Sequence, residues 1–199
     1  MLAQPAIQSA LIDLQDLIAL CHSESSFALL EHGLSTSFAN VVELTIDDLK
    51  PDTACCQSKT TLLLALLRSA SKTLSRLCLD IDLTPHCERR FDPSEQKEIA
   101  RLQTESLKRI ASAILGAPKL QHLTMTAKFF RGFEHLDVAT TIRFFSRIMS
   151  ADSLKVIQFD GLPCNFENSD ANREASGVDV QHVNKVGLSS NLEKVVLRL

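Results

Sequence analysis

The chain has 199 residues, of which 45% are apolar and 23% are charged, and its formal net charge is −3. These values are typical of a globular protein, and they exclude a disordered chain, a collagen and a disulfide-stabilised miniprotein. The slightly acidic balance argues against a nucleic-acid partner, since nucleic-acid binding needs an excess of basic residues. The longest apolar run, residues 62–67, is too short to span a bilayer, so we expect no membrane partner.

The cysteines and the N-terminus indicate a cytoplasmic or nuclear protein. No two cysteines form a C-x-x-C pair, and a chain of this length does not need disulfides, so we expect reduced thiols rather than three disulfides. The first residues lack a basic region, and Asp13 and Asp16 interrupt their apolar stretch, which makes a poor signal peptide. The cysteines are Cys21, Cys55, Cys56, Cys78, Cys87 and Cys164.

The N-terminal residues predict two helices. Residues 5–21 carry apolar side chains at helical spacing, and a second, shorter helix is predicted over residues 25–31. We interpret residues 1–33 as an N-terminal helical cap. The apolar positions of the first helix are Ile7, Leu11, Leu14, Ile18 and Cys21.

One short apolar pattern then recurs five times, which is the most informative feature of the sequence. It places apolar residues at its first, fourth and sixth positions, as in a strand that buries one face. We predict one parallel sheet with strands in sequence order, near 42–46, 75–79, 121–125, 155–159 and 193–197. The copies begin at Val41, Leu74, Leu120, Leu154 and Leu192.

Between these strands lie segments with helical periodicity, over residues 59–71, 94–115 and 135–149. Asp92 and Pro93 mark the start of the second of these helices, and Gly116 marks its end. A single strand–helix unit cannot bury both of its faces, whereas stacked units can. The sequence therefore predicts an α/β fold built from repeated units.

The recurring L-x-x-L-x-L pattern resembles that of the leucine-rich repeat family, in its irregular ribonuclease-inhibitor-like and F-box-associated form. The resemblance covers residues 34–199 and implies about five units in a single solenoid, with parallel strands on the concave side and helices on the convex side. The family's Asn or Cys at the ninth position is absent. That position holds Leu49, Asp82, Lys128 and Leu162.

The alternative fold is a layered α/β domain, which would need Gly-rich turns between strand and helix. None is present in the sequence. The chain also ends on an apolar strand. This leaves open a fragment of a longer repeat protein, dimerisation through the C-terminal edge, and shielding by residues 164–188.

The third, fifth and seventh positions of each copy point away from the helices, because side chains alternate along a strand. The resemblance implies that these positions bind a protein partner on the concave face, and that F-box-associated relatives recruit substrates to a ubiquitin ligase. The alternative is a solvated sheet face. The candidate residues, row by row, are Glu43, Arg76, His122 and Val156, then Thr45, Cys78, Thr124 and Gln158, then Asp47, Asp80, Thr126 and Asp160.

Two acidic residues of the seventh row have to lie close together. Neighbouring strands are about 4.8 Å apart, so Asp47 and Asp80 would repel each other. This favours a basic partner or a cation. The alternative is that Arg76 and solvent neutralise both carboxylates. A pair of carboxylates is too few for a dedicated metal cage, and we expect no metal and no cofactor.

Cys78 and His122 fall on neighbouring strands and could form a nucleophile or a zinc site. No third orienting group is evident, and the sequence contains none of the common catalytic or phosphate-binding motifs, so we do not expect an enzyme. The alternative functions are a small α/β enzyme with its site near Cys78 and His122, and a structural fragment of a larger repeat protein.

Residues 128–133 hold three phenylalanines in a segment predicted as a loop. They are either an exposed anchor for a partner, as aromatic residues often are, or part of the core. In the second case Phe129 and Phe133 turn inward.

Overall fold

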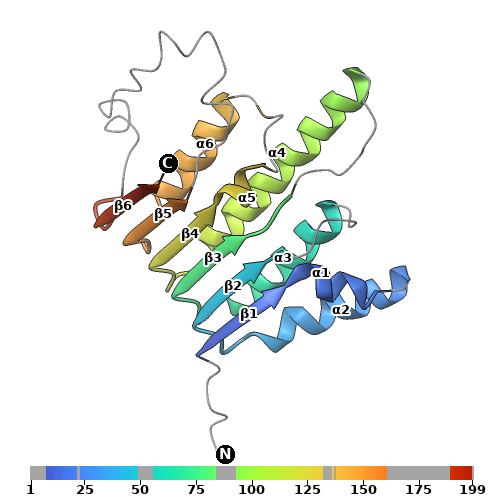
Figure 1. The fold of residues 1–199 in the computed structure, drawn as a ribbon. Helices are drawn as coiled ribbons and strands as arrows, with labels where there is room; N and C mark the ends of the chain where they lie inside the picture. The colour runs from blue at the N-terminus through green and yellow to red at the C-terminus, as the bar shows by residue number, and fades with distance from the viewer. Residues whose placement is uncertain are drawn as a thin grey trace, which may run out of the picture.

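A computed structural model describes residues 8–21, 23–48, 56–83, 93–131, 136, 138–160 and 189–198. They form an α/β fold with a single sheet of six parallel strands, which follow one another in sequence order (Figure 1). The predicted parallel sheet is confirmed, and each of its five predicted strands is shifted by one residue. The strands are β1 (Ser9–Asp13), β2 (Glu43–Asp47), β3 (Arg76–Asp80), β4 (His122–Thr126), β5 (Val156–Asp160) and β6 (Lys194–Arg198).

The helix predicted over residues 5–21 is wrong for its first part, because residues 9–13 form β1 and pair with β2. The cap is therefore not purely helical. Leu11, which the helical interpretation placed in the core, is 68% exposed. Pairing with β2 satisfies the backbone groups of the segment that face this strand, and this tertiary contact overrides its local helical periodicity.

Two helices follow β1, namely α1 (Leu14–Ala19) and α2 (Glu24–Ser37). Asp13 caps α1, because its Oδ1 accepts hydrogen bonds from the backbone N–H groups of Gln15 at 2.8 Å and of Asp16 at 3.4 Å. The predicted second helix is confirmed as α2, which is longer than expected at both ends.

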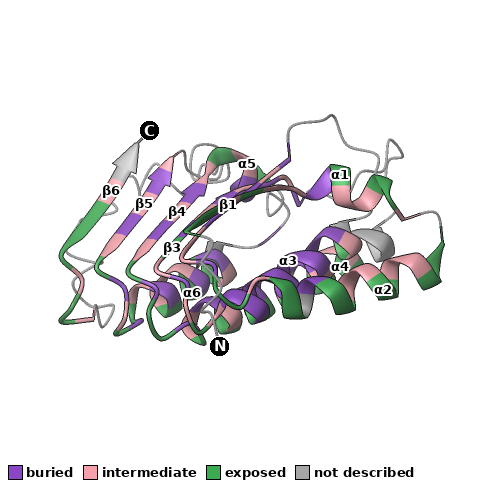
Figure 2. Ribbon diagram, turned by 90° about the horizontal axis from the view of Figure 1, so that it is seen from below, coloured by how far each residue is buried: buried purple, intermediate pink, exposed green. Residues whose placement is uncertain are grey.

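The other predicted helices are confirmed as α3 (Cys56–Ala70), α4 (Pro93–Leu115) and α6 (Val138–Met149). Together with α2 they lie against one face of the sheet (Figure 2). The short helix α5 (Ala127–Arg131) directly follows β4. The predicted N-cap Asp92, the start of the helix predicted over 135–149 and the segment 164–188 lie outside the described residues.

The core lies between the sheet and these four helices. The fourth and sixth positions of β3, β4 and β5 supply it, and all six are at most 3% exposed, as predicted. The fourth-position row runs on to Val195 of β6, which is 42% exposed, so the core thins out toward that strand. The six buried residues are Leu77, Leu79, Leu123, Met125, Ile157 and Phe159.

Candidate functional site: the open face of the sheet

We call the sheet surface opposite α2, α3, α4 and α6 the open face. No helix in the described part of the chain covers it (Figure 2). The strand register brings the twelve candidate residues together on this face, in three rows that run across the strands. Arg76 is exposed, and the other eleven are partly exposed.

The middle row of the open face consists of small or neutral side chains. In register, Thr45, Cys78, Thr124 and Gln158 lie side by side on β2 to β5. These four side chains are uncharged as long as the Cys78 thiol keeps its proton. This row is the part of the face that would lose least from being desolvated.

The row at the amino ends of the strands holds an exposed ion pair. Arg76 lies 3.4 Å from Glu43, and the two side chains are 60% and 46% exposed. The expectation that Arg76 neutralises Asp47 and Asp80 is therefore wrong, because the guanidinium pairs with a different carboxylate at the opposite end of the strand.

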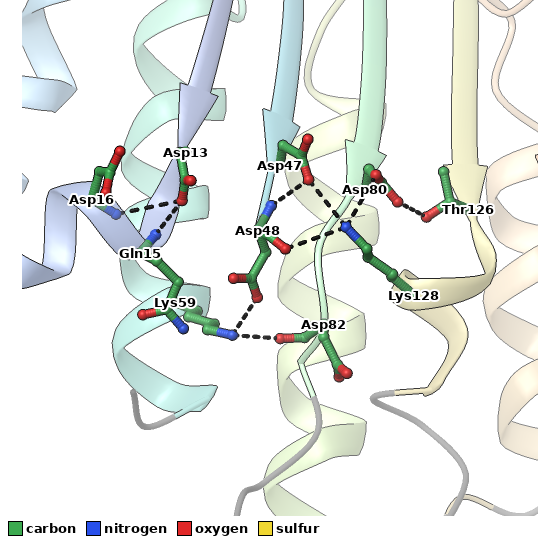
Figure 3. A network of polar contacts seen from close by, with 10 residues as sticks. All are labelled: Asp13, Gln15, Asp16, Asp47, Asp48, Lys59, Asp80, Asp82, Thr126 and Lys128. Atoms are coloured by element: carbon green, nitrogen blue, oxygen red, sulfur yellow. Dashed lines mark hydrogen bonds and ion pairs between the residues drawn. The ribbon is translucent and has the colours of Figure 1, made fainter. Parts of the chain in front are cut away.

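Lys128, and not Arg76, forms the ion pairs with Asp47 and Asp80. Its Nζ lies 3.2 Å from Asp47 Oδ1 and 3.3 Å from Asp80 Oδ2, and it donates a hydrogen bond to the Asp48 carbonyl oxygen at 3.2 Å (Figure 3). Thr126 Oγ1 also donates a hydrogen bond to Asp80. The strand register pairs the two residues, as predicted, and a lysine of the same chain bridges their carboxylates.

The bridge favours the charged form of Lys128. Partial burial lowers the pKa of the ammonium group, but the hydrogen bond to Asp47 and the charges of Asp80 and Asp47 outweigh it, so the pKa is raised. The group therefore stays protonated over the whole physiological range.

The phenylalanines around Lys128 hold it in position. Phe129 and Phe130 are 0% and 2% exposed, so the hypothesis of an exposed aromatic anchor is wrong for both. The ring of Phe129 lies 6.2 Å from that of Phe144, and the ring of Phe130 lies 5.9 Å from that of Phe159. These contacts fix α5 to the core and leave Lys128 free to reach the strand ends. Phe133 lies outside the described residues.

A second lysine lies beneath the same edge of the sheet, and sequence reasoning missed it. Lys59 is completely buried and forms an ion pair with Asp48, and it donates a hydrogen bond to the Asp82 carbonyl oxygen at 2.9 Å (Figure 3). Lys59 precedes Leu62 and Leu63 by three and four residues, which places it on the apolar side of α3. That spacing is the sequence feature that could have identified it.

Cys78 is poorly suited to act as a nucleophile. Burial raises the pKa of its thiol, and the negative charges of Asp80, Asp160 and Asp47 raise it further, so the reactive thiolate is scarce. The register places Thr124 beside Cys78, and His122 beside Arg76. The described residues contain no group of three His, Cys, Asp or Glu side chains that could hold a metal ion.

Comparisons with protein-family models, with curated proteins and with solved structures found no match to this chain. Among the described helices, none combines the length and the apolar character needed to cross a membrane. The functional argument therefore depends on the geometry of the open face.

Proposed function

We propose that the chain is a non-enzymatic protein–protein interaction module that binds a protein partner on its open face. We further propose that its units form an irregular leucine-rich-repeat-like solenoid, in which the open face is the concave one. The observation that supports partner binding is that one sheet face is covered by helices, whereas the other carries a neutral row between two charged edges.

The neutral row suits the centre of an interface, because interface centres are depleted of charge. The edges suit its rim. The exposed pair of Arg76 and Glu43 contributes little to stability and is easily exchanged, and the Lys128 side chain, which is 35% exposed, can be reached by a partner. A partner would desolvate the middle while its own charged groups pair with those at the rim.

Two points remain on the type of function: whether the chain is an enzyme, and how narrow its binding role is. The raised pKa of Cys78 speaks against the alternative of an enzyme that uses Cys78 and His122. The narrower role, recruitment of substrates to an F-box-type ubiquitin ligase, has only the resemblance of the repeats in its support.

The test compares two charge substitutions on opposite sides of the sheet. Thr124→Arg places an unpaired charge in the middle row of the open face. Lys97→Glu changes the charge of an exposed residue on α4 and is the control. Both purified variants should keep the circular dichroism of the wild type.

Partners captured by the wild-type chain should be lost with Thr124→Arg and kept with Lys97→Glu. Ubiquitin-ligase subunits among those partners would support the narrower role, and partners without them would limit the proposal to binding. If Lys97→Glu abolished capture while Thr124→Arg left it intact, binding on the open face would have to be abandoned.

A further inference from the structure

A groove of about 430 Å³ lies between α3 and α4, on the helical side of the molecule. It is lined by the apolar side chains of Leu64 and Ala113 and by three cationic ones, those of Arg68, Lys108 and Arg109. It is separate from the open face, because these two helices lie on the other side of the sheet (Figure 2).

The three cations have no acidic partner among the residues that the structure describes. Within the described residues, none of Arg68, Lys108 and Arg109 forms an ion pair. Arg101, about two turns earlier on α4, behaves differently, since its Nη2 lies 2.7 Å from Glu98. On α4, Arg101 is thus paired, whereas Lys108 and Arg109 are not, and Lys97 near the start of the helix also has no ion pair among the described residues.

One carboxylate, that of Glu105, also lines the groove. It lies one turn before Arg109, in the order that favours an ion pair along a helix, yet the structure forms no such pair. A fourth cation approaches from α6, where Arg147 Nη2 donates a hydrogen bond to Ser112 Oγ at 3.2 Å. Three helices therefore direct four cations toward a groove with a single carboxylate.

The ordinary explanation for such cations covers only half of them. Basic residues in the last turn of a helix are stabilised by the helix dipole, and Arg68 and Arg147 occupy that turn in α3 and α6. Lys108 and Arg109 do not, because the last turn of α4 contains no basic residue. The whole chain is acidic, with a net charge of −3, so composition does not account for the cluster either.

We propose that this groove binds an acidic segment of a partner protein, rich in Asp and Glu. Guanidinium groups pair with carboxylates through two parallel hydrogen bonds, which makes Arg68 and Arg109 suitable recognition groups. Ala113 offers a small apolar surface for the aliphatic stems of the bound side chains, and Leu64, which is 2% exposed, lies at the base of the groove. Binding here is independent of the partner proposed for the open face.

The experiment measures the affinity of a fluorescein-labelled hexaglutamate peptide by anisotropy at an ionic strength of about 0.1 M, where exposed charges more than about 10 Å apart are largely screened. Arg68→Glu combined with Arg109→Glu should weaken binding at least about tenfold, the ratio expected when charge-assisted hydrogen bonds are lost. The control combines Lys97→Glu with Lys194→Glu, which makes the same change in net charge at exposed sites outside the groove. It should stay within about twofold of the wild type, because exposed charges at a distance are screened.

Glu105→Gln should tighten binding, since it removes the one carboxylate in the groove lining, which repels the acidic peptide. Thr124→Arg should leave the affinity for the peptide unchanged, which separates this proposal from the one on the open face. The groove proposal is overturned if the wild type does not bind the peptide, or if the control weakens binding as much as the groove variant does.

Discussion

Two lysines form ion pairs with aspartates at the carboxyl ends of the strands, in opposite environments. Lys59 and Asp48 are buried beneath the sheet, with side chains 0% and 2% exposed. Lys128 lies on the open face between Asp47 and Asp80, and its side chain is 35% exposed. Because side chains alternate along an extended chain, the neighbours Asp47 and Asp48 point to opposite sides and supply both bridges.

The contrast shows how the same ion-pair chemistry can serve two purposes. A buried pair ties together the elements that supply its groups, here α3 and the ends of β2 and β3, and it cannot be opened cheaply. A half-exposed pair adds little to stability, so its groups remain available to a partner. Each prediction below tests whether the two faces of the sheet differ in this way.

The largest effect is expected for Lys59→Met. It leaves the Asp48 carboxylate buried without a cation, which should lower the free energy of unfolding by about 3–5 kcal/mol in urea titrations. The double variant Lys59→Met/Asp48→Leu is the control. It should recover most of the loss, because it removes both charges and also the Asp48 Oδ1 atom, which has no hydrogen-bond partner among the described residues. A loss below about 1 kcal/mol for the single variant would contradict the structural role of the buried pair.

Substitutions of two neighbouring residues on β4 should differ nearly as much in their effect on the free energy of unfolding. Leu123 is 1% exposed and faces the helices, so Leu123→Ala should cost roughly 2–5 kcal/mol. Thr124 faces the open side, and Thr124→Ala should stay within about 0.5 kcal/mol of the wild type. Similar shifts of the two unfolding midpoints would show that the open face is not a separate surface.

The predicted part of the fold depended on local periodicity. The strands β2 to β6 each keep the same apolar spacing, and α3, α4 and α6 have clear apolar stripes, so both could be recognised without tertiary information. The strand β1 was missed for the same reason. Ile7, Leu14 and Ile18 fit a helix, and the small Ala10 at the fourth position hid a sixth copy of the strand pattern, which begins at Ile7.

The open face was predictable from the alternation of side chains, but its ion pairs were not. Asp47 and Asp80 are adjacent because the register is set by the repeat. Their partner Lys128 follows β4, and its side chain reaches back to the ends of β3 and β2. Only the packing of α5 brings the lysine within reach of both carboxylates. The one available indication was its place at the ninth position of its copy, at the same edge of the sheet.

Lys128→Met should cost less than about 1 kcal/mol, in contrast to Lys59→Met, because solvent partly screens ion pairs whose lysine side chain is 35% exposed. The cost should shrink further when the salt concentration is raised toward 1 M. Urea unfolding of the wild type and the variant at low and high salt measures both effects. A loss as large as that of Lys59→Met would mean that the two bridges do not differ in purpose.

The smallest effect concerns the thiol of Cys78. Its pKa is raised above the ordinary value of 9.0 by burial and by the charges of Asp80, Asp160 and Asp47. As the pH rises above 9.0, the unfolded thiol loses its proton while the folded thiol keeps it, so the free energy of unfolding falls with pH. Cys78→Ser removes the titrating group, and its stability should fall less between pH 8.5 and pH 10.

Lys128→Met links this titration to the bridge, because it takes away the cation that offsets two of those carboxylates. The pKa of Cys78 should then rise further, and the alkylation of Cys78 by iodoacetamide, followed by peptide mapping, should be slower at pH 9 than in the wild type. Lys59→Met changes a cation on the other side of the sheet and serves as the comparison under conditions where it is folded. If both substitutions slowed the reaction equally, the two lysines would act on the open face alike, and its electrostatics would not be set by Lys128.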